Sequence, residues 1–139
     1  MANKKRVMIV DDDKDILLSV KQILERNGYK VYSFDNGRDF LRALENGKKP
    51  TLVILDIMMP EMSGWDIRRR LEERPGWDRI PVVFMTARTN QTSEEMYERY
   101  GVGYIKKPFD VNDFMDVVVN IADSKQKYSK KMKELRFCS

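Results

Sequence analysis

The chain has 139 residues, of which 42% are hydrophobic and 35% charged, the composition of an ordinary globular protein. This length predicts one domain with a substantial hydrophobic core. No apolar run approaches the roughly 20 residues that a membrane helix needs, and the first residues lack the apolar core of a signal peptide. A single cysteine, Cys138, argues against a disulfide framework. We therefore expect a cytoplasmic protein that does not bind membranes.

Histidine content and charge exclude further classes of function. The sequence contains no histidine, which excludes histidine metal sites and Ser–His or Cys–His nucleophile pairs. The formal net charge is +4, but residues 125–139 alone carry +5, so the rest of the chain is slightly acidic. Because the basic character belongs to the tail, we do not expect direct binding to nucleic acid.

Short apolar runs alternate with amphipathic segments along the chain. The apolar runs predict strands at residues 6–10, 30–34, 52–55, 80–85 and 103–106. Helical spacing predicts helices at about residues 16–26, 40–45, 63–74, 92–100 and from 111 onward, with capping boxes at Ser63-x-x-Asp66 and Thr92-x-x-Glu95. Five strand–helix units with short connections predict a parallel sheet covered by helices on both faces.

The third predicted strand is followed at once by a carboxylate, Asp56. Residues 52–55 are uniformly apolar, as expected of a strand buried on both faces. Ligands of open α/β sheets bind just beyond the carboxyl ends of the strands, which favours a functional role for Asp56. Taken alone, Asp56 is equally well explained as a turn residue or as a cap for the helix that begins near Ser63.

Other polar residues are predicted at the same edge of the sheet. The first strand leads into Asp11-Asp12-Asp13, the fourth into Thr86 and the fifth into Lys107. Each has an ordinary explanation in helix capping, a turn or a solvated lysine, but such explanations fit the combination poorly. Clustered carboxylates repel one another and need a cation, and oxygen ligands suit Mg²⁺. A carboxylate, a metal, a hydroxyl and an ammonium group together suit one task, the acceptance of a phosphoryl group.

These stretches resemble the receiver domain of two-component response regulators, in particular the stand-alone, chemotaxis-regulator-like kind. The resemblance covers residues 5–123 and rests on Met8-Ile9-Val10-Asp11-Asp12, Val53-Ile54-Leu55-Asp56-Ile57-Met58-Met59-Pro60-x-x-Ser63-Gly64, Val82-Val83-Phe84-Met85-Thr86-Ala87 and Gly103-Tyr104-Ile105-Lys106-Lys107-Pro108-Phe109. It implies a flavodoxin-like α/β fold, with a doubly wound five-stranded parallel sheet in strand order 2-1-3-4-5 and five helices.

The resemblance implies a metal-dependent phosphoacceptor. Asp56 corresponds to the residue that takes a phosphoryl group from a partner sensor histidine kinase or histidine phosphotransfer protein. The corresponding Mg²⁺ ligands are Asp11, Asp12, Asp56 and the backbone carbonyl of Met58, and Mn²⁺ is expected to substitute. Asp12 fits a direct ligand and Asp11 one that acts partly through water, whereas we interpret Asp13 as a helix cap.

The resemblance also implies a conformational switch. Thr86 and Lys107 correspond to the residues that contact the phosphoryl group, and Tyr104 to an aromatic that changes between outward and inward rotamers. The bond between Lys107 and Pro108 is expected to be cis. The face formed by the fourth helix, fifth strand and fifth helix is then expected to signal to an unidentified downstream protein or to form a homodimer. Such a domain is a signalling protein rather than an enzyme, apart from its own phosphorylation and dephosphorylation.

Two positions at the expected mouth of the site set this chain apart. Met58 and Arg88 lie two residues beyond Asp56 and Thr86. In the family such positions tune how water reaches the acyl phosphate. A bulky apolar Met58 should shield it, which predicts slow loss of the phosphoryl group.

Residues 124–139 are expected to form a basic C-terminal extension of the receiver domain. The apolar register of the last helix continues as an interrupted heptad-like stripe, with Lys125, Tyr128, Met132 and Leu135. One interpretation is an extended last helix that packs on a partner or a second copy, or leads into an output domain outside this chain. A frayed lysine-rich tail explains the composition equally well.

Three rival interpretations use some of the same residues. A haloacid-dehalogenase-type aspartyl phosphatase places its nucleophile after the first strand in an Asp-x-Asp-x-Thr motif, but residues 11–15 lack that threonine. A flavodoxin needs a phosphate loop where this chain has aspartates, which would repel phosphate. A receiver-like module that binds partners without phosphorylation is disfavoured by the intact set of Asp56, Thr86 and Lys107.

Overall fold

A computed structural model describes residues 4–87 and 103–123, and the structural findings concern those residues. They contain one parallel sheet with the order β2-β1-β3-β4-β5, which confirms the predicted topology. Its strands are β1 (Arg6–Val10), β2 (Lys30–Phe34), β3 (Leu52–Asp56), β4 (Val82–Thr86) and β5 (Gly103–Lys106).

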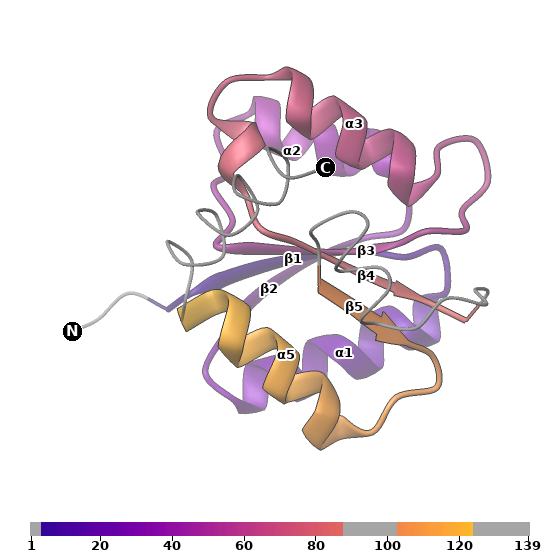
Figure 1. Cartoon of the computed structure of the whole chain (residues 1–139), viewed down its shortest axis with the longest axis vertical. Coiled ribbons are helices and arrows are strands. Elements are labelled where there is room, and N and C mark those ends of the chain that lie inside the picture. Colours follow the sequence, from indigo (N-terminus) through magenta and orange to yellow (C-terminus); the bar gives the residue numbers. More distant parts are fainter. Residues whose placement is uncertain (1–3, 88–102, 124–139) are drawn as a thin grey trace, which may run out of the picture.

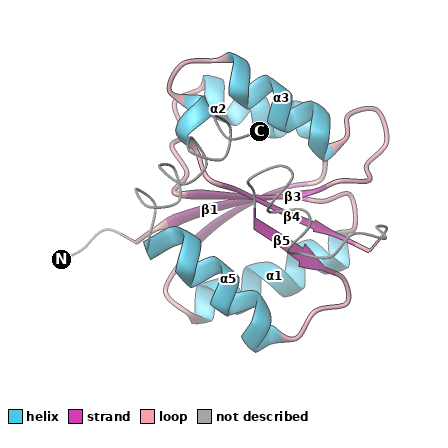
Figure 2. Ribbon diagram, in the orientation of Figure 1, coloured by secondary structure: helices cyan, strands magenta, loops and turns pink. Residues whose placement is uncertain are grey.

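Helices cover both faces of the sheet (Figure 1). α1 (Lys14–Arg26) and α5 (Val111–Asp123) lie on one face, and α2 (Gly37–Glu45) and α3 (Gly64–Glu73) lie on the other (Figure 2). The helix predicted at residues 92–100 and the extension of the last helix beyond residue 123 lie outside the described residues. In the described part of the chain, no helix is long and apolar enough to cross a membrane.

Side-chain caps explain where the helices begin. The carboxylate of Asp13 accepts hydrogen bonds from the backbone N–H groups of Asp15 and Ile16, which confirms Asp13 as the cap of α1. Ser63 and Asp66 form the predicted reciprocal capping box at α3. These caps fix the points at which the loops before α1 and α3 end, and both loops line the candidate site described below.

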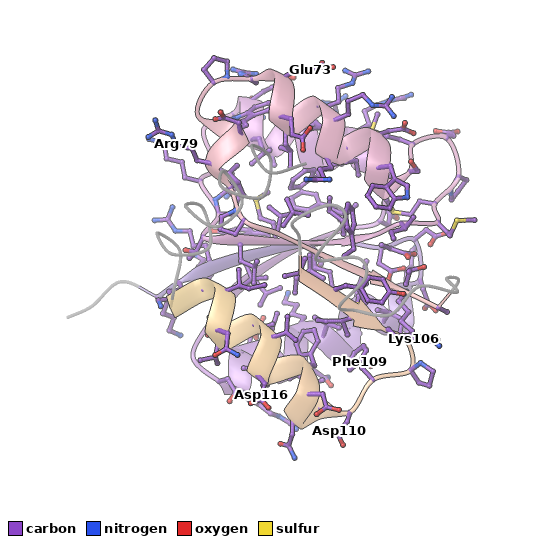
Figure 3. The ribbon with its side chains drawn as sticks, viewed as in Figure 1. Glu73, Arg79, Lys106, Phe109, Asp110 and Asp116 are labelled. Atoms are coloured by element: carbon purple, nitrogen blue, oxygen red, sulfur yellow. The ribbon has the colours of Figure 1, made fainter. Side chains whose placement is uncertain are left out.

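The alternation of side chains along each strand builds two hydrophobic layers. In β1, Val7 and Ile9 belong to the layer under α1 and α5, whereas Met8 and Val10 belong to the layer under α2 and α3. Figure 3 shows side chains filling the space between the sheet and each helix pair. All five residues of β3 are buried, as expected of a central strand, so Asp56 is held by a fully enclosed strand.

The predicted start of the fourth strand was wrong. β4 begins at Val82 rather than at residue 80, because a 3₁₀ turn (Trp77–Arg79) precedes it and the backbone N–H of Ile80 donates to the carbonyl of Trp77. Pro81 lies just before the strand, and its carbonyl accepts a hydrogen bond from Val53 at 3.0 Å. The strand preference of Ile80 was therefore overridden by the local turn, and Pro81, which has no N–H to donate, lies outside the regular strand.

Candidate functional site

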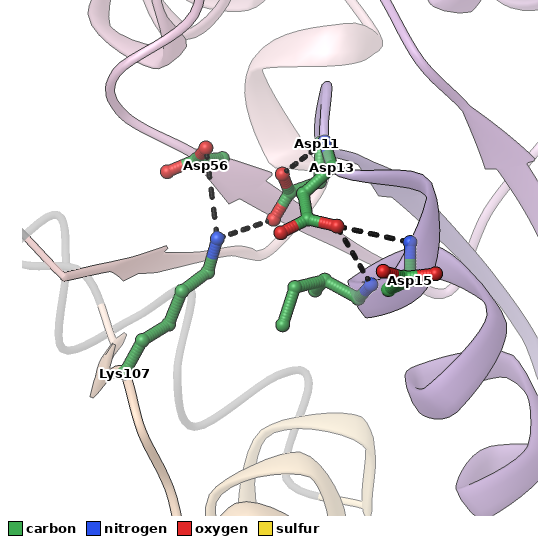
Figure 4. Close-up of polar contacts among 6 residues, drawn as sticks. Asp11, Asp13, Asp15, Asp56 and Lys107 are labelled. Atoms are coloured by element: carbon green, nitrogen blue, oxygen red, sulfur yellow. Dashed lines mark hydrogen bonds and ion pairs between the residues drawn. The ribbon is translucent and has the colours of Figure 1, made fainter.

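The predicted site residues meet at the carboxyl edge of the sheet. Asp11 follows β1, Asp56 ends β3, Thr86 ends β4 and Lys107 follows β5. An open cavity of ≈ 650 Å³ lies at this edge and is lined by Asp12, Asp13, Asp56, Ile57, Met58, Met59, Pro60, Ser63, Thr86, Ala87 and Lys107. Figure 4 shows Asp11, Asp56 and Lys107 pointing toward one another from their different strands. The site is where an open α/β sheet is expected to bind its ligand.

Backbone hydrogen bonds hold these residues in place. The N–H of Asp11 donates to the carbonyl of Phe34 at 3.1 Å, and the N–H of Lys107 donates to the carbonyl of Thr86 at 3.0 Å. Each bond extends the sheet by one residue beyond the regular strands. The peptide bond between Lys107 and Pro108 is cis, as predicted. The sheet thus fixes the backbone from which the side chains of Asp11 and Lys107 extend into the site.

Three carboxylates form an acidic cluster. Oxygen atoms of Asp11, Asp12 and Asp56 all lie within 4.8 Å of one another. Asp11 is fully buried and Asp56 is 5% exposed, whereas Asp12 is exposed and lines the cavity. Two enclosed carboxylates with a third at the rim are oxygen ligands of the kind that Mg²⁺ prefers, and the open cavity leaves room for the waters that Mg²⁺ retains. The donor set therefore fits a divalent cation.

Lys107 supplies the positive charge inside the cluster. Its Nζ atom lies 2.6 Å from Oδ2 of Asp11 and 3.7 Å from Oδ2 of Asp56. The other oxygen of Asp11 accepts a hydrogen bond from the backbone N–H of Asp13 at 2.9 Å. Both oxygens of Asp11 are therefore engaged by protein donors, whereas Asp56 has the weaker contact with the lysine.

The environment of Asp56 favours its protonated form. The pKa of this carboxyl is raised from 3.8 to about 6, chiefly by burial and in addition by repulsion from the nearby Asp11 carboxylate. The positive charge of Lys107 and a hydrogen bond with the backbone of Met58 oppose that rise in pKa. A carboxylate that is costly to ionise gains most from a bound cation that offsets its negative charge.

The remaining predicted residues differ in their exposure. Thr86 is buried, 1% exposed, at the end of β4. Tyr104 pairs with Phe84 across β4 and β5 and is 4% exposed, so its ring occupies an inward position in this structure. Met58 is the opposite case, because its side chain is 51% exposed at the mouth of the cavity. Arg88, also predicted at this mouth, lies outside the described residues.

Some features of the site were not predicted from the sequence. Ser63 was interpreted only as a helix cap, but it also lines the cavity beside Asp56. Its place between a strand-end aspartate and the next helix could have indicated this. Lys107 lies closer to Asp11 than to Asp56, and Asp56 has a hydrogen bond with the backbone of Met58. Neither contact leaves a signal in the sequence, because both depend on the exact placement of side chains in the folded chain.

Comparisons with known proteins agree with this geometry. Residues 7–119 match the model of the response regulator receiver domain. The chain is 31% identical over 114 residues to protein PilH of Pseudomonas aeruginosa, and the match covers 81% of this chain and 93% of PilH. A crystal structure of a CheY-like response regulator receiver domain protein from Methanospirillum hungatei superposes with a TM-score of 0.77 at 28% identity, covering 90% of this chain and 98% of that one.

Other relatives are considerably longer than this chain. It is 34% identical over 134 residues to response regulator SaeR of Staphylococcus epidermidis, and the match covers 94% of this chain but only 57% of SaeR. The chain thus spans about half the length of several curated relatives that it matches. The match to the receiver-domain model concerns residues 7–119. This is the domain that carries the acidic cluster at the carboxyl edge of its sheet.

Proposed function

Because the chain belongs to the family of response regulator receiver domains, we propose that it accepts a phosphoryl group on Asp56 in a reaction that requires Mg²⁺. One observation carries this proposal. Asp56 ends the central strand with two further carboxylates within 4.8 Å and the ammonium group of Lys107 at 3.7 Å. No other residue of the cluster combines near-complete burial with a direct position on the cavity wall, because Asp12 is exposed and Asp11 does not line the cavity.

The proposed reaction moves a phosphoryl group from a phosphohistidine to the chain. A carboxylate oxygen of Asp56 attacks the phosphorus atom, the P–N bond breaks, and the leaving imidazole retains the electron pair. The printed sequence holds no histidine, so the donor lies outside it, on a sensor histidine kinase or a histidine phosphotransfer protein. Lys107 is already within the cluster, and we propose that its ammonium group stabilises negative charge on the transferred oxygens.

We propose that Asp12, Asp56 and the backbone carbonyl of Met58 hold Mg²⁺ directly and that Asp11 acts partly through water. The contacts of Asp11 support this division, because its two oxygens already accept hydrogen bonds from Asp13 and Lys107. The exposed Asp12 carries no such bond among the described residues and faces the cavity. When bound, Mg²⁺ would supply positive charge beside the transferred oxygens, with Mn²⁺ as a substitute.

We further propose that phosphorylation changes the surface formed by β5 and α5, the described part of the face predicted for the fourth helix, fifth strand and fifth helix. Thr86 and Lys107 connect the site to this surface. The backbone carbonyl of Thr86 accepts a hydrogen bond from the N–H of Lys107, and Lys107 directly follows β5, the strand that carries Tyr104. A phosphoryl group that draws the side chains of Thr86 and Lys107 inward would shift the equilibrium between two conformations of that surface. A downstream protein, or a second copy of the chain, would then read the change.

The direct test is intact mass after incubation with acetyl phosphate, with and without Mg²⁺, for the wild type and Asp56→Asn. The proposal expects one phosphoryl adduct on the wild type that needs Mg²⁺ and is absent from the variant. An adduct that persists in Asp56→Asn would place the acceptor elsewhere. Lack of an adduct on a wild type that binds Mg²⁺ and is folded would favour the alternative of a receiver that binds partners without phosphorylation.

A further inference from the structure

A second polar pocket lies at the opposite end of the sheet from Asp56. Arg6 begins β1 and is paired in register with Lys30, which begins β2. The pocket, with a volume of ≈ 240 Å³, is lined by Arg6, Met8, Tyr32, Asn46, Gly47, Lys48, Lys49 and Pro50. Because strands rise about 3.3 Å per residue, the two ends of β1 are separated by about 13 Å. The pocket is therefore distinct from the phosphorylation site.

The pocket has a firm floor and a charged rim. Met8 is 1% exposed and Pro50 is buried, so the floor belongs to the packed core. The ring of Tyr32 forms one wall and is half-buried. The Nζ atom of Lys48 lies 4.2 Å from the centroid of that ring and the Nζ of Lys30 lies 5.5 Å from it, so cation–π attraction holds both ammonium groups at the wall.

The positive charge of this pocket is not balanced by neighbouring carboxylates. Within the described part of the chain, no acidic side chain lines the pocket. Among the described residues, the ion pairs involve other side chains, and Arg6, Lys30, Lys48 and Lys49 take part in none of them. The cations also act on Tyr32, because a hydrogen bond with Lys30 and the charges of Lys30, Lys48 and Arg6 lower the pKa of its phenol. Three cations act on this one hydroxyl group and Lys49 adds a fourth positive charge to the pocket lining, which creates a local field that attracts an anion.

The carboxyl end of α2 does not cancel this field. A helix C-terminus carries partial negative charge on its last carbonyl groups. Here the carbonyls of Arg42, Ala43 and Leu44 accept hydrogen bonds from the backbone N–H groups of Asn46, Lys48 and Gly47, respectively. These bonds turn the chain so that Lys48 and Lys49 reach the rim, and they leave the lysine ammonium groups as the dominant charges at the opening.

We propose that this pocket binds a phosphate-class oxyanion, either free phosphate or the phosphate group of a small phosphorylated ligand. The volume is below the range of about 300–1,000 Å³ that is usual for drug-sized ligands, which favours a single anionic group over a large molecule. Lysine and arginine donors suit phosphate oxygens, and the phenol of Tyr32 adds a neutral donor. Such a ligand would bind beside edge strand β2, outside the surface proposed to switch.

The test is a titration monitored by the backbone amide and tyrosine resonances in NMR, at constant ionic strength and with EDTA present. EDTA removes metal, so the acidic cluster around Asp56 repels phosphate and does not compete. The probes are inorganic phosphate, pyrophosphate and adenosine monophosphate, each compared with chloride. We expect saturable shifts of Arg6, Tyr32 and Lys48. Tighter binding of the nucleotide than of phosphate would identify a phosphorylated ligand as the source, and the reverse would identify the free anion.

The matched variants are Lys48→Gln/Lys49→Gln and, as a control, Lys21→Gln on α1. Removing two rim cations should weaken binding about tenfold, since each exposed charge pair contributes modestly. Lys21 is 45% exposed, does not line the pocket, and forms its ion pair among the described residues with Glu25 at 3.8 Å. Linear, non-saturable shifts, equal affinity in the double variant, or an equal loss in Lys21→Gln would each overturn the proposal. Unchanged amide spectra away from the pocket would show that the variants are folded.

Discussion

The ammonium group of Lys107 lies closer to Asp11 than to Asp56, at 2.6 Å from Oδ2 of Asp11 and 3.7 Å from Oδ2 of Asp56 (Figure 4). In this structure the lysine therefore pairs mainly with the fully buried carboxylate of Asp11. A shift of about 1 Å toward Asp56 would bring it into contact with a group attached there. The ammonium group can thus contact either Asp11 or a group attached to Asp56 without leaving the cluster.

Replacing Lys107 should raise the pKa of Asp56 and slow its phosphorylation. The positive charge of Lys107 lowers that pKa, so Lys107→Gln should move it above about 6 in metal-free protein. Loss of one charged donor is expected to slow transfer from acetyl phosphate by about 10²-fold or more. Carboxyl ¹³C resonances followed against pH give the pKa, and intact mass against time gives the rate.

The neighbouring lysine provides the control for this experiment. Lys106 is exposed and projects from the outer end of β5 (Figure 3), so Lys106→Gln removes the same charge without touching the cluster. It should phosphorylate at nearly the wild-type rate. Similar rates for the two glutamine variants would show that only net charge matters and that the 2.6 Å contact has no chemical role.

Asp56 should destabilise the metal-free fold at neutral pH. Its pKa is raised from 3.8 to about 6, so the folded chain binds the proton more tightly than the unfolded chain does. Stability therefore falls as the pH rises from about 3.8 to about 6, and the full penalty remains above that range. Asp56→Asn should thus increase the free energy of unfolding by about 1–3 kcal/mol at pH 7.5, and the gain should vanish below about pH 4.

Urea denaturation of both proteins in EDTA at several pH values measures this difference. Using the difference between wild type and variant cancels the titration of the other carboxylates. Addition of Mg²⁺ should reduce the gap at pH 7.5, because a bound cation offsets the repulsion between Asp11 and Asp56. A gain that is independent of pH would show that a packing change, rather than the charge, accounts for the effect.

Asp12 and Asp13 are neighbours in the chain but are expected to differ in Mg²⁺ binding. Asp12 belongs to the acidic cluster, whereas the carboxylate of Asp13 accepts the N–H groups at the start of α1. Asp12→Asn should weaken Mg²⁺ about tenfold or more, since it removes a direct charged ligand. Asp13→Asn removes the same charge but keeps a good helix cap, so it should weaken Mg²⁺ binding only about twofold. Thermal unfolding at graded Mg²⁺ concentrations measures both affinities, and equal losses would contradict the proposed ligand set.

The site residues could be predicted because two independent patterns agree. Apolar runs located the strands, and parallel topology brings their carboxyl ends to one edge, so Asp11, Asp56, Thr86 and Lys107 were expected to converge. The start of β4 was missed because the turn at Trp77–Arg79 depends on hydrogen bonds that composition does not reveal. The sequence also could not predict that Lys107 lies closer to Asp11 than to Asp56, since the parallel topology brings both carboxylates within reach of the lysine side chain.

Gly64 should be required for the correct position of the phosphoacceptor. A Cβ atom at this residue would overlap the backbone carbonyl oxygen of Asp56 and lie 3.0 Å from Cα of Ile57. These are backbone atoms of the strand end, so Gly64→Ala should shift Asp56 and destabilise the fold by about 1–3 kcal/mol. Phosphorylation should slow at the same time, which intact mass against time would show.

Gly37→Ala is the matched comparison for Gly64→Ala. There the added Cβ would meet Sδ of Met62 at 2.6 Å and Cδ1 of Ile67 at 2.9 Å, which are ends of flexible side chains. Those atoms can move, so the variant should lose less stability and phosphorylate normally. If Gly64→Ala were no worse than Gly37→Ala in both urea denaturation and phosphorylation rate, the close approach to β3 would have no functional consequence.

Met58 should slow the loss of the phosphoryl group from Asp56. Its side chain is 51% exposed at the mouth of the cavity, two residues after the phosphoacceptor, so it can cover the acyl phosphate from the solvent side. Replacing it by a smaller polar residue should admit and orient water, and we expect Met58→Asn to lose its phosphoryl group several-fold faster. Met58→Leu keeps an apolar cover of similar volume and should behave like the wild type. The decay of the phosphorylated mass after removal of acetyl phosphate measures all three proteins, and rapid decay of the wild type that Met58→Asn leaves unchanged would refute the shielding role.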